Sequence, residues 1–302
     1  MSLFPLLLLA ITLISAVLIL GNWRWQHKTK ARLLRFDLKP KAVRNGHESI
    51  PHCVNRYLES VMPQEAHFES VILTHRGFFN MAEKGQNWKA FRSQQWVAPN
   101  AYQFLWDGRI QILPGLTVQV HDGLIGELGI LQAQLAGWIP LAYQNDRATL
   151  AQGELLRFLA ESVWYPWMLK PENGVSWQAI GENKAEASIC LGSNRVSLVF
   201  EFGDDGKVLS VFCHDRPRLV AGKPQPTPWF GRFWDYREFN GFCLPHAGEV
   251  AWVIDGQEHP YWRGTLETVE YAQSAERQVG FGVKKASSIH HAFGHDHEAH
   301  HP

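Results

Sequence analysis

The stretch TPWFGRFWDYREFNGFCLPHAGEVAW, residues Thr227 to Trp252, carries eight aromatic side chains in 26 residues. In its last part Val250 and Trp252 alternate with Glu249 and Ala251, and the turn DGQEHP (255–260) then leads into YWRGTLETVEY (261–271). Alternation with a period of two is typical of antiparallel strands that have one apolar and one polar face. The stretch therefore predicts two strands joined by a turn.

The same alternation runs through most of the chain after Phe68. It is clear in YQFLW (102–106), LTVQV (116–120) and LQAQL (131–135), and again in AEASICL (185–191), RVSLVFEF (195–202) and KVLSVFC (207–213). Gly, Asn and Asp separate the last three segments, as expected for turns between neighbouring antiparallel strands. The sequence thus predicts a mainly β fold over residues 47–272.

Two segments follow the helical period instead. Residues 149–165 have a broad apolar stripe that includes Leu155, Leu159 and Val163, and Pro166 ends the pattern. A shorter stripe within 49–63 predicts a second helix. A helix with a wide apolar face between two groups of strands should cover the sheet. Glu154, Arg157 and Glu161 of the long helix are interpreted as surface ion pairs, with a polar cluster against the sheet as the alternative.

The N-terminus is apolar and uncharged from Phe4 to Gly21, about the ~20 residues that a membrane-spanning helix needs. A signal peptide is the alternative, but no Lys or Arg precedes the segment and no small-x-small cleavage pattern follows it. We expect a transmembrane anchor over 1–22 and a basic juxtamembrane linker over 23–46.

The linker carries eight Lys or Arg residues against the single acid Asp37. By the positive-inside rule, we expect a single-pass protein of the cell (inner) membrane with its β domain in the cytoplasm. The periplasmic or extracellular side is the alternative. The whole chain has 29 basic and 29 acidic residues, which argues against nucleic acid as a partner.

The segment 273–302 has no strand or helix pattern and is interpreted as a disordered, His-rich tail. Neutral imidazoles at this density bind transition metals opportunistically, although a tail without a dedicated metal is the simpler interpretation. The histidines concerned are His290, His291, His295, His297, His300 and His301. No cofactor is predicted.

Aromatic and arginine side chains around the opening stretch form the candidate ligand site. Trp234 and Tyr236 share one strand face with Arg232, and such a mixed face suits the lining of a cavity. Packing within the core is the alternative. The candidate residues are Trp164, Trp229, Arg232, Trp234, Tyr236, Trp252, Trp262 and Arg263.

Five motifs occur in a fixed order, namely QGELLRFLAESVWYP (152–166), GVSW (174–177), TPWFGRF with a following Tyr (227–236), GEVAW (248–252) and PYWRGTL (260–266). Between about Pro51 and Tyr271 the chain resembles an uncharacterised family of bacterial proteins, a domain of unknown function often preceded by a membrane segment. More loosely it resembles the lipoprotein-carrier fold. That resemblance implies a strongly curved, incompletely closed antiparallel sheet, a half-barrel, with one or two helices on its concave side. Lipoprotein carriers work outside the inner membrane, which conflicts with the charge rule.

These features favour a membrane-anchored protein that binds an apolar or amphipathic ligand, such as a lipid or acyl chain, between sheet and helix without catalysis. Trp164 would close the cavity, and Arg232 and Arg263 would meet a polar head group. The first alternative is a module that binds a protein partner in the membrane. The second is a hydrolase, which is disfavoured because no nucleophile–base pairing is visible.

Overall fold

Thirteen strands form one antiparallel sheet in the part of the chain that the computed structural model describes, residues 4–36, 50–63, 68–82, 85–143, 147–220 and 223–272. Their order is β6-β5-β4-β3-β2-β1-β13-β12-β11-β10-β9-β8-β7. The strands are β1 (Ser70–Asn80), β2 (Trp88–Ala98), β3 (Gln103–Leu113), β4 (Leu116–Ile125), β5 (Leu128–Leu135), β6 (Ile139–Tyr143), β7 (Ser176–Gly181), β8 (Lys184–Leu191), β9 (Asn194–Phe202), β10 (Val208–Val220), β11 (Lys223–Phe239), β12 (Phe242–Ile254) and β13 (Gln257–Ala272).

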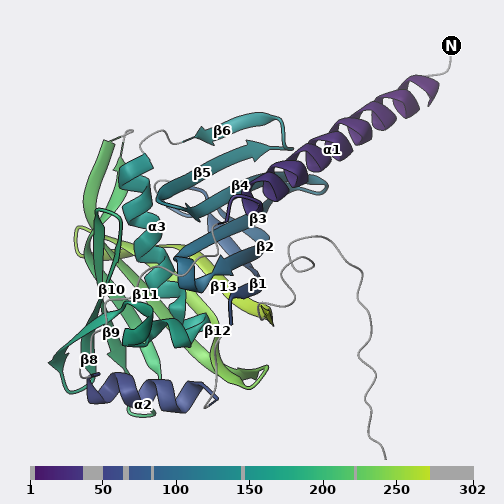
Figure 1. Cartoon of the computed structure of the whole chain (residues 1–302). Coiled ribbons are helices and arrows are strands. Elements are labelled where there is room, and N and C mark those ends of the chain that lie inside the picture. The colour runs from purple at the N-terminus through teal and green to yellow at the C-terminus, as the bar shows by residue number, and fades with distance from the viewer. Residues whose placement is uncertain are drawn as a thin grey trace, which may run out of the picture.

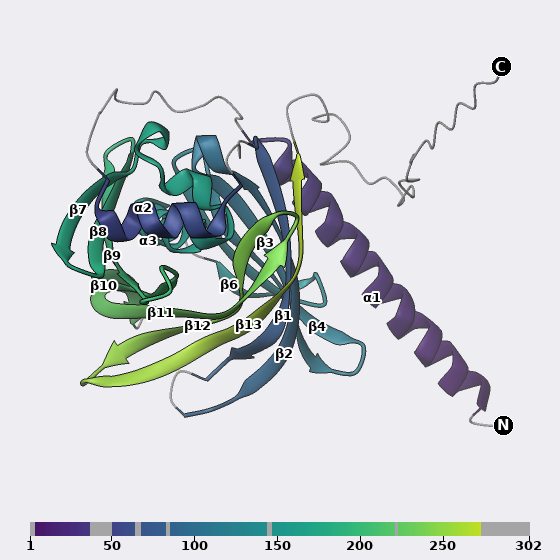
Figure 2. The same ribbon diagram turned by 90° about the horizontal axis from the view of Figure 1, so that it is seen from below.

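The first and last strands, β1 and β13, pair at the middle of the sheet, whereas β6 and β7 are its two free edges. The sheet is therefore curved but not closed (Figures 1 and 2). The predicted mainly β, half-open architecture is confirmed. The six histidines of the tail and residues 37–46 of the expected linker lie outside the described residues.

Two helices cover the concave side, as expected. Helix α3 (Arg147–Glu161) contacts β4, β5, β9 and β10, so it lies across the hollow of the sheet (Figure 1). Leu155 and Leu159 of its apolar stripe are at most 1% exposed, and burying each contributes about 1.5–3 kcal/mol. Three short 3-10 turns (Ser162–Trp164, Pro166–Leu169 and Pro171–Asn173) follow α3. Helix α2 (His52–Val61) contacts β8, β9 and β12.

The N-terminal helix α1 (Phe4–Leu33) is long and apolar enough to cross a membrane, a test that a signal sequence also passes. Its first half projects away from the sheet (Figures 1 and 2). Gly21, Trp25, Thr29 and Leu33 recur every four residues and are buried, so they form one face that packs on β3 and β4.

The helix thus continues beyond residue 22, where we had expected a linker to begin. The reason is that Trp25 and Thr29 find polar partners on the sheet. The Trp25 indole donates to Asp107 Oδ1 at 2.9 Å, and the Thr29 hydroxyl donates to Asp107 Oδ2 at 3.0 Å. Between 23 and 33 the basic segment is a docked helix.

Candidate functional site

The two faces of the sheet carry separate hollows, because successive side chains of a strand point to opposite faces. On β3, Trp106 faces inward, and the Arg157 guanidinium of α3 lies 5.6 Å from its ring centroid. The next residue, Asp107, faces outward and meets α1. Residues two positions from Trp106 along the strand share its inner face, and residues two positions from Asp107 share its outer face.

The larger hollow is a groove of about 810 Å³ on the outer face. It extends from the β3–β4 hairpin across β2 and β1 to β11–β13. Its lining residues are Arg76, Gly77, Phe78, Ala90, Phe91, Arg92, Arg109, Gln111, Gly115, Thr117, Trp234, Ala247, Gly248, Glu249, Arg263, Gly264 and Thr265.

Three arginines form a row across the groove. Arg76 of β1 pairs with Arg92 of β2, which pairs with Arg109 of β3. Like charges directly opposite on neighbouring strands destabilise a sheet. Arg76 has Glu267 at 3.3 Å, and Arg109 has Asp107 at 3.9 Å.

The middle arginine of this row, Arg92, is exposed, and its guanidinium group has no ion-pair or hydrogen-bond partner among the described residues. Within the part of the chain that the structure describes, no acidic side chain therefore neutralises the charge at the centre of the row. An anion in the groove would do so.

The far end of the groove combines charge with apolar surface. Arg263 and Arg232 both contact the carboxylate of Glu249, which is their shared counter-charge. Phe78 and Trp234 also line the groove and are 54% and 47% exposed. Arginines beside exposed aromatic side chains suit a ligand that has both an anionic and an apolar part.

The smaller hollow lies on the inner face, between α3 and the sheet, and has a volume of about 90 Å³. Three lining tryptophans stand two positions before a glycine, in WDG (106–108), WFG (229–231) and WRG (262–264). In the first and third, a methyl group on the glycine would overlap the tryptophan ring. The ring of Trp106 therefore lies over Gly108, and the ring of Trp262 lies over Gly264, because glycine has no side chain to occupy that space.

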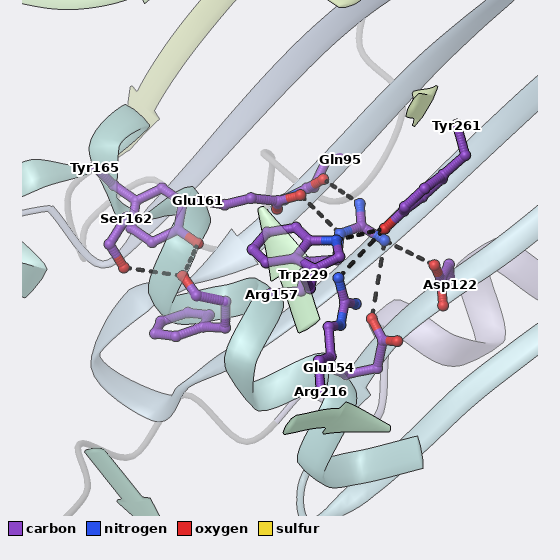
Figure 3. Close-up of polar contacts among 11 residues, drawn as sticks. Gln95, Asp122, Glu154, Arg157, Glu161, Ser162, Tyr165, Arg216, Trp229 and Tyr261 are labelled. Carbon is purple, nitrogen blue, oxygen red and sulfur yellow. Dashed lines mark hydrogen bonds and ion pairs between the residues drawn. The ribbon is translucent and has the colours of Figure 1, made fainter. Parts of the chain in front are cut away.

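A buried ionic cluster fills the space beside this cavity (Figure 3). Arg157 of α3 contacts Asp122 of β4 at 2.8 Å and Glu161 at 2.7 Å, and Glu154 lies at 3.8 Å. It also donates to Gln95 of β2 at 3.3 Å. The interpretation of these charges as surface ion pairs is wrong, because α3 lies inside the curve of the sheet and turns this side toward β2 and β4.

Protonation within the cluster follows from burial and neighbouring charge. Burial raises the pKa of Glu154 well above its usual value, and Asp122 adds to the effect. Burial likewise raises the pKa of Asp122. For Arg157 burial acts against the charged form, but Glu161, Asp122 and Glu154 more than compensate, so its pKa lies above the usual value. Arg157 remains a cation that ties α3 to the sheet.

The inner cavity therefore provides little room for a ligand. Pockets that hold small molecules typically have about 300–1,000 Å³, whereas the inner cavity has about 90 Å³. Trp164, which we expected to close a cavity, is 4% exposed and donates to Pro245 O at 3.0 Å. In the described residues no group of His, Cys, Asp and Glu is arranged to hold a metal.

The eight predicted site residues are distributed over several places. Trp234 and Arg263 line the outer groove, whereas Trp164, Trp229 and Trp262 line the inner cavity. The structure therefore separates residues that we had grouped together.

The remaining three predicted residues line neither hollow. Trp252 lines a third hollow, of about 160 Å³, beside α3. Arg232 pairs with Glu258 at 2.5 Å, and the Tyr236 hydroxyl donates to Val208 O at 2.9 Å. Tyr236 thus contributes to packing on β10.

Sequence reasoning missed Arg76, Arg92 and Arg109. Each is a polar residue on an alternating strand, and nothing in its local pattern distinguishes it from other exposed arginines. The signal that distinguishes them is their position opposite one another, which depends on the pairing register of three strands.

Comparison with known proteins identifies a family but no activity. Residues 48–271 match the model described as "Family of unknown function (DUF6920)". No curated protein matches the chain. Among solved structures, a LolA superfamily protein from Nitrosomonas europaea matches with a TM-score of 0.41 and 9% sequence identity, over 76% of this chain and 97% of that one.

Proposed function

The chain belongs to the family of unknown function DUF6920, and we propose that it is a membrane-anchored protein that binds an amphipathic, anionic ligand, such as a lipid, without converting it chemically. The observation that carries this proposal is the row of Arg76, Arg92 and Arg109 in a groove of about 810 Å³. We assign the ligand to this groove on the outer face, not to the space between sheet and helix.

Volume and chemistry both support the outer groove. Its size lies within the range of about 300–1,000 Å³ that is usual for ligand pockets. Guanidinium groups form paired, charge-assisted hydrogen bonds with phosphate or carboxylate oxygens. Phe78 and Trp234 offer apolar surface to the remainder of the ligand.

The position of the groove relative to α1 supports a lipid. Arg109 donates to the side-chain oxygen of Asn22, the first polar side chain after the apolar segment that ends at Gly21. If α1 crosses a bilayer, residues at this level lie in the head-group layer. The arginine row would then be beside lipid phosphates.

The experiment is native mass spectrometry of the full chain, purified in a mild non-ionic detergent, followed by lipid extraction. The double variant Arg76→Gln/Arg92→Gln removes two of the three charges in the row. A charge-assisted hydrogen bond contributes about 1.5–3 kcal/mol, so we expect co-purifying anionic lipid to fall at least about tenfold.

The matched control is Arg195→Gln, which removes an exposed arginine of β9 that has no ion-pair or side-chain hydrogen-bond partner among the described residues. It should leave the bound lipid unchanged. Equal lipid content in the double variant and the wild type would refute the proposed site. A stoichiometric protein partner without lipid would instead favour an interaction module.

A further inference from the structure

Two hairpin tips that flank α1 are apolar and uncharged. The β3–β4 tip has the sequence ILPGL (112–116), and the β5–β6 tip has LAGWIPL (135–141). Leu113 and Ile139 are 59% and 57% exposed. The views of Figures 1 and 2 agree that the β3–β4 hairpin lies beside α1.

The β5–β6 tip contacts the apolar part of the helix directly. The indole of Trp138 donates to Val17 O at 2.9 Å. A methyl group on Gly21 would collide with Ala136 O and with the Trp138 ring. The Arg24 guanidinium lies 5.2 Å from the centroid of the same ring. The tip is therefore level with residues 17–24, where the apolar segment ends and the basic segment begins.

Three other turns of the sheet have a different composition. The β7–β8, β9–β10 and β12–β13 turns carry acidic residues, namely Glu182, Asp204, Asp205 and Asp255. The edge strand β6 also lacks the charge that usually protects a free edge, because all five residues of Ile139–Tyr143 are uncharged and exposed. The two tips beside α1 and the edge strand β6 thus combine exposed apolar side chains with a lack of charge.

We propose that the β3–β4 and β5–β6 tips insert into the interfacial layer of the bilayer that α1 crosses. The occupant of this surface is lipid, because the surface is continuous with a membrane-spanning segment through the Trp138–Val17 hydrogen bond. A tryptophan beside an arginine at the end of an apolar segment is also the usual composition of a membrane interface. This inference requires α1 to span the membrane, but it does not require a ligand in the groove.

Tip insertion has a consequence for the β domain. The docked half of α1 and the two tips would hold the sheet in one orientation, so the domain would not rotate freely on a tether. Gly115 in the β3–β4 tip, and Gln111 and Thr117 beside it, also line the outer groove. Insertion of this tip would place the mouth of the groove against the head groups.

The test uses the full chain in nanodiscs of phosphatidylcholine and phosphatidylglycerol, with nitroxide labels on cysteine variants. Leu113→Cys and Ile139→Cys report on the two tips, and Ile180→Cys, a 51% exposed position on β7, is the matched control. The accessible natural cysteines Cys190 and Cys243 are replaced by Ser. Each variant must retain the β-sheet circular-dichroism spectrum of the parent.

The readout is the ratio of collisions with oxygen, which concentrates in the bilayer, to collisions with a water-soluble nickel complex. We expect this ratio to be at least several-fold higher at both tips than at position 180. Tip labels that are as accessible to nickel as the control would overturn the inference, and so would insertion of only one tip. Neither result depends on lipid co-purification, so the two proposals can fail separately.

Discussion

The indole ring of Trp25 stacks on the imidazole ring of His121, with the ring centroids 4.1 Å apart and the planes 24° apart. His121 is completely buried, and its Nε2 atom lies 2.7 Å from the Thr29 hydroxyl oxygen. Asp107 accepts hydrogen bonds from both Trp25 and Thr29. The orientation of α1 on the sheet is therefore determined by specific polar contacts as well as by burial.

Trp25→Ala should release the docked half of α1. It removes a fully buried ring and one of the donors to Asp107, and loss of a buried aromatic residue typically costs about 3–5 kcal/mol. Hydrogen exchange of the full chain should show faster exchange in β3 and β4. Trp23→Ala removes a ring that is 60% exposed and should leave exchange unchanged. Equal protection in the two variants would contradict this role of Trp25.

Arg157→Met should destabilise the β domain strongly. It leaves Asp122 and Glu161 buried without their cation, and breaking a buried ion pair from one side typically costs about 3–5 kcal/mol. Urea unfolding, followed by circular dichroism, measures the loss. Arg195→Met is the surface control. A midpoint shift no larger than that of the control would show that the cluster is not essential for stability.

Two glycine-to-alanine substitutions should have opposite effects. At Gly264 the added methyl group would overlap the Trp262 ring, so we expect a loss of about 1–3 kcal/mol from overpacking. Gly153 lies inside α3, and a methyl group added there would have nothing within 4 Å. Alanine at this position should therefore stabilise the fold by about 0.5–1 kcal/mol. Thermal unfolding measures both effects, and we expect the melting temperature to fall for Gly264→Ala and to rise for Gly153→Ala.

The buried histidines should make stability depend on pH below neutrality. Burial, with a contribution from Arg157, lowers the pKa of His75 to about 3, and burial lowers the pKa of His121 to about 4 although Asp107 opposes it. Between these values and the ordinary 6.5, the unfolded chain binds more protons than the folded one. Acidification through this window therefore removes about 1.4 kcal/mol per pH unit for each histidine.

Glu154 and Asp122 act in the opposite direction, because their raised pKa values favour proton binding by the folded state. The measurement is therefore a comparison. His75→Phe retains an aromatic ring against Trp164 and should reduce the slope of stability against pH, between pH 4 and 6.5, by about 1.4 kcal/mol per unit. Parallel curves for variant and wild type would mean that His75 does not titrate as described.

Much of the architecture follows from local patterns. Alternation such as that of LTVQV at 116–120 predicts strands, because one face of the sheet is buried and the other is not. The stripe of Leu155 and Leu159 predicts a covering helix for a similar reason. The apolar segment before Trp23 predicts a helix by length and composition. Each of these patterns lies within one short stretch of sequence and does not depend on residues far away in the chain.

The composition of the candidate site depends on contacts between residues that are far apart in the sequence. Trp229 and Trp234 belong to one aromatic stretch, but alternation sends Trp229 to the inner cavity and Trp234 to the outer groove. Residue type alone suggested that they act together. The free volume on each face, which decides where a ligand fits, depends on how closely α3 packs against the sheet.

By itself, then, the sequence determined the elements, their two-faced character and the apolar N-terminal segment, because these depend on the period and on the uninterrupted length of apolar side chains. The tertiary structure decided that Arg76, Arg92 and Arg109 form one row, since strand register brings together residues that are far apart in the chain. It also decided that Arg157 is buried, because the curvature of the sheet encloses α3. Both are long-range consequences of pairing and curvature, and no local pattern encodes them.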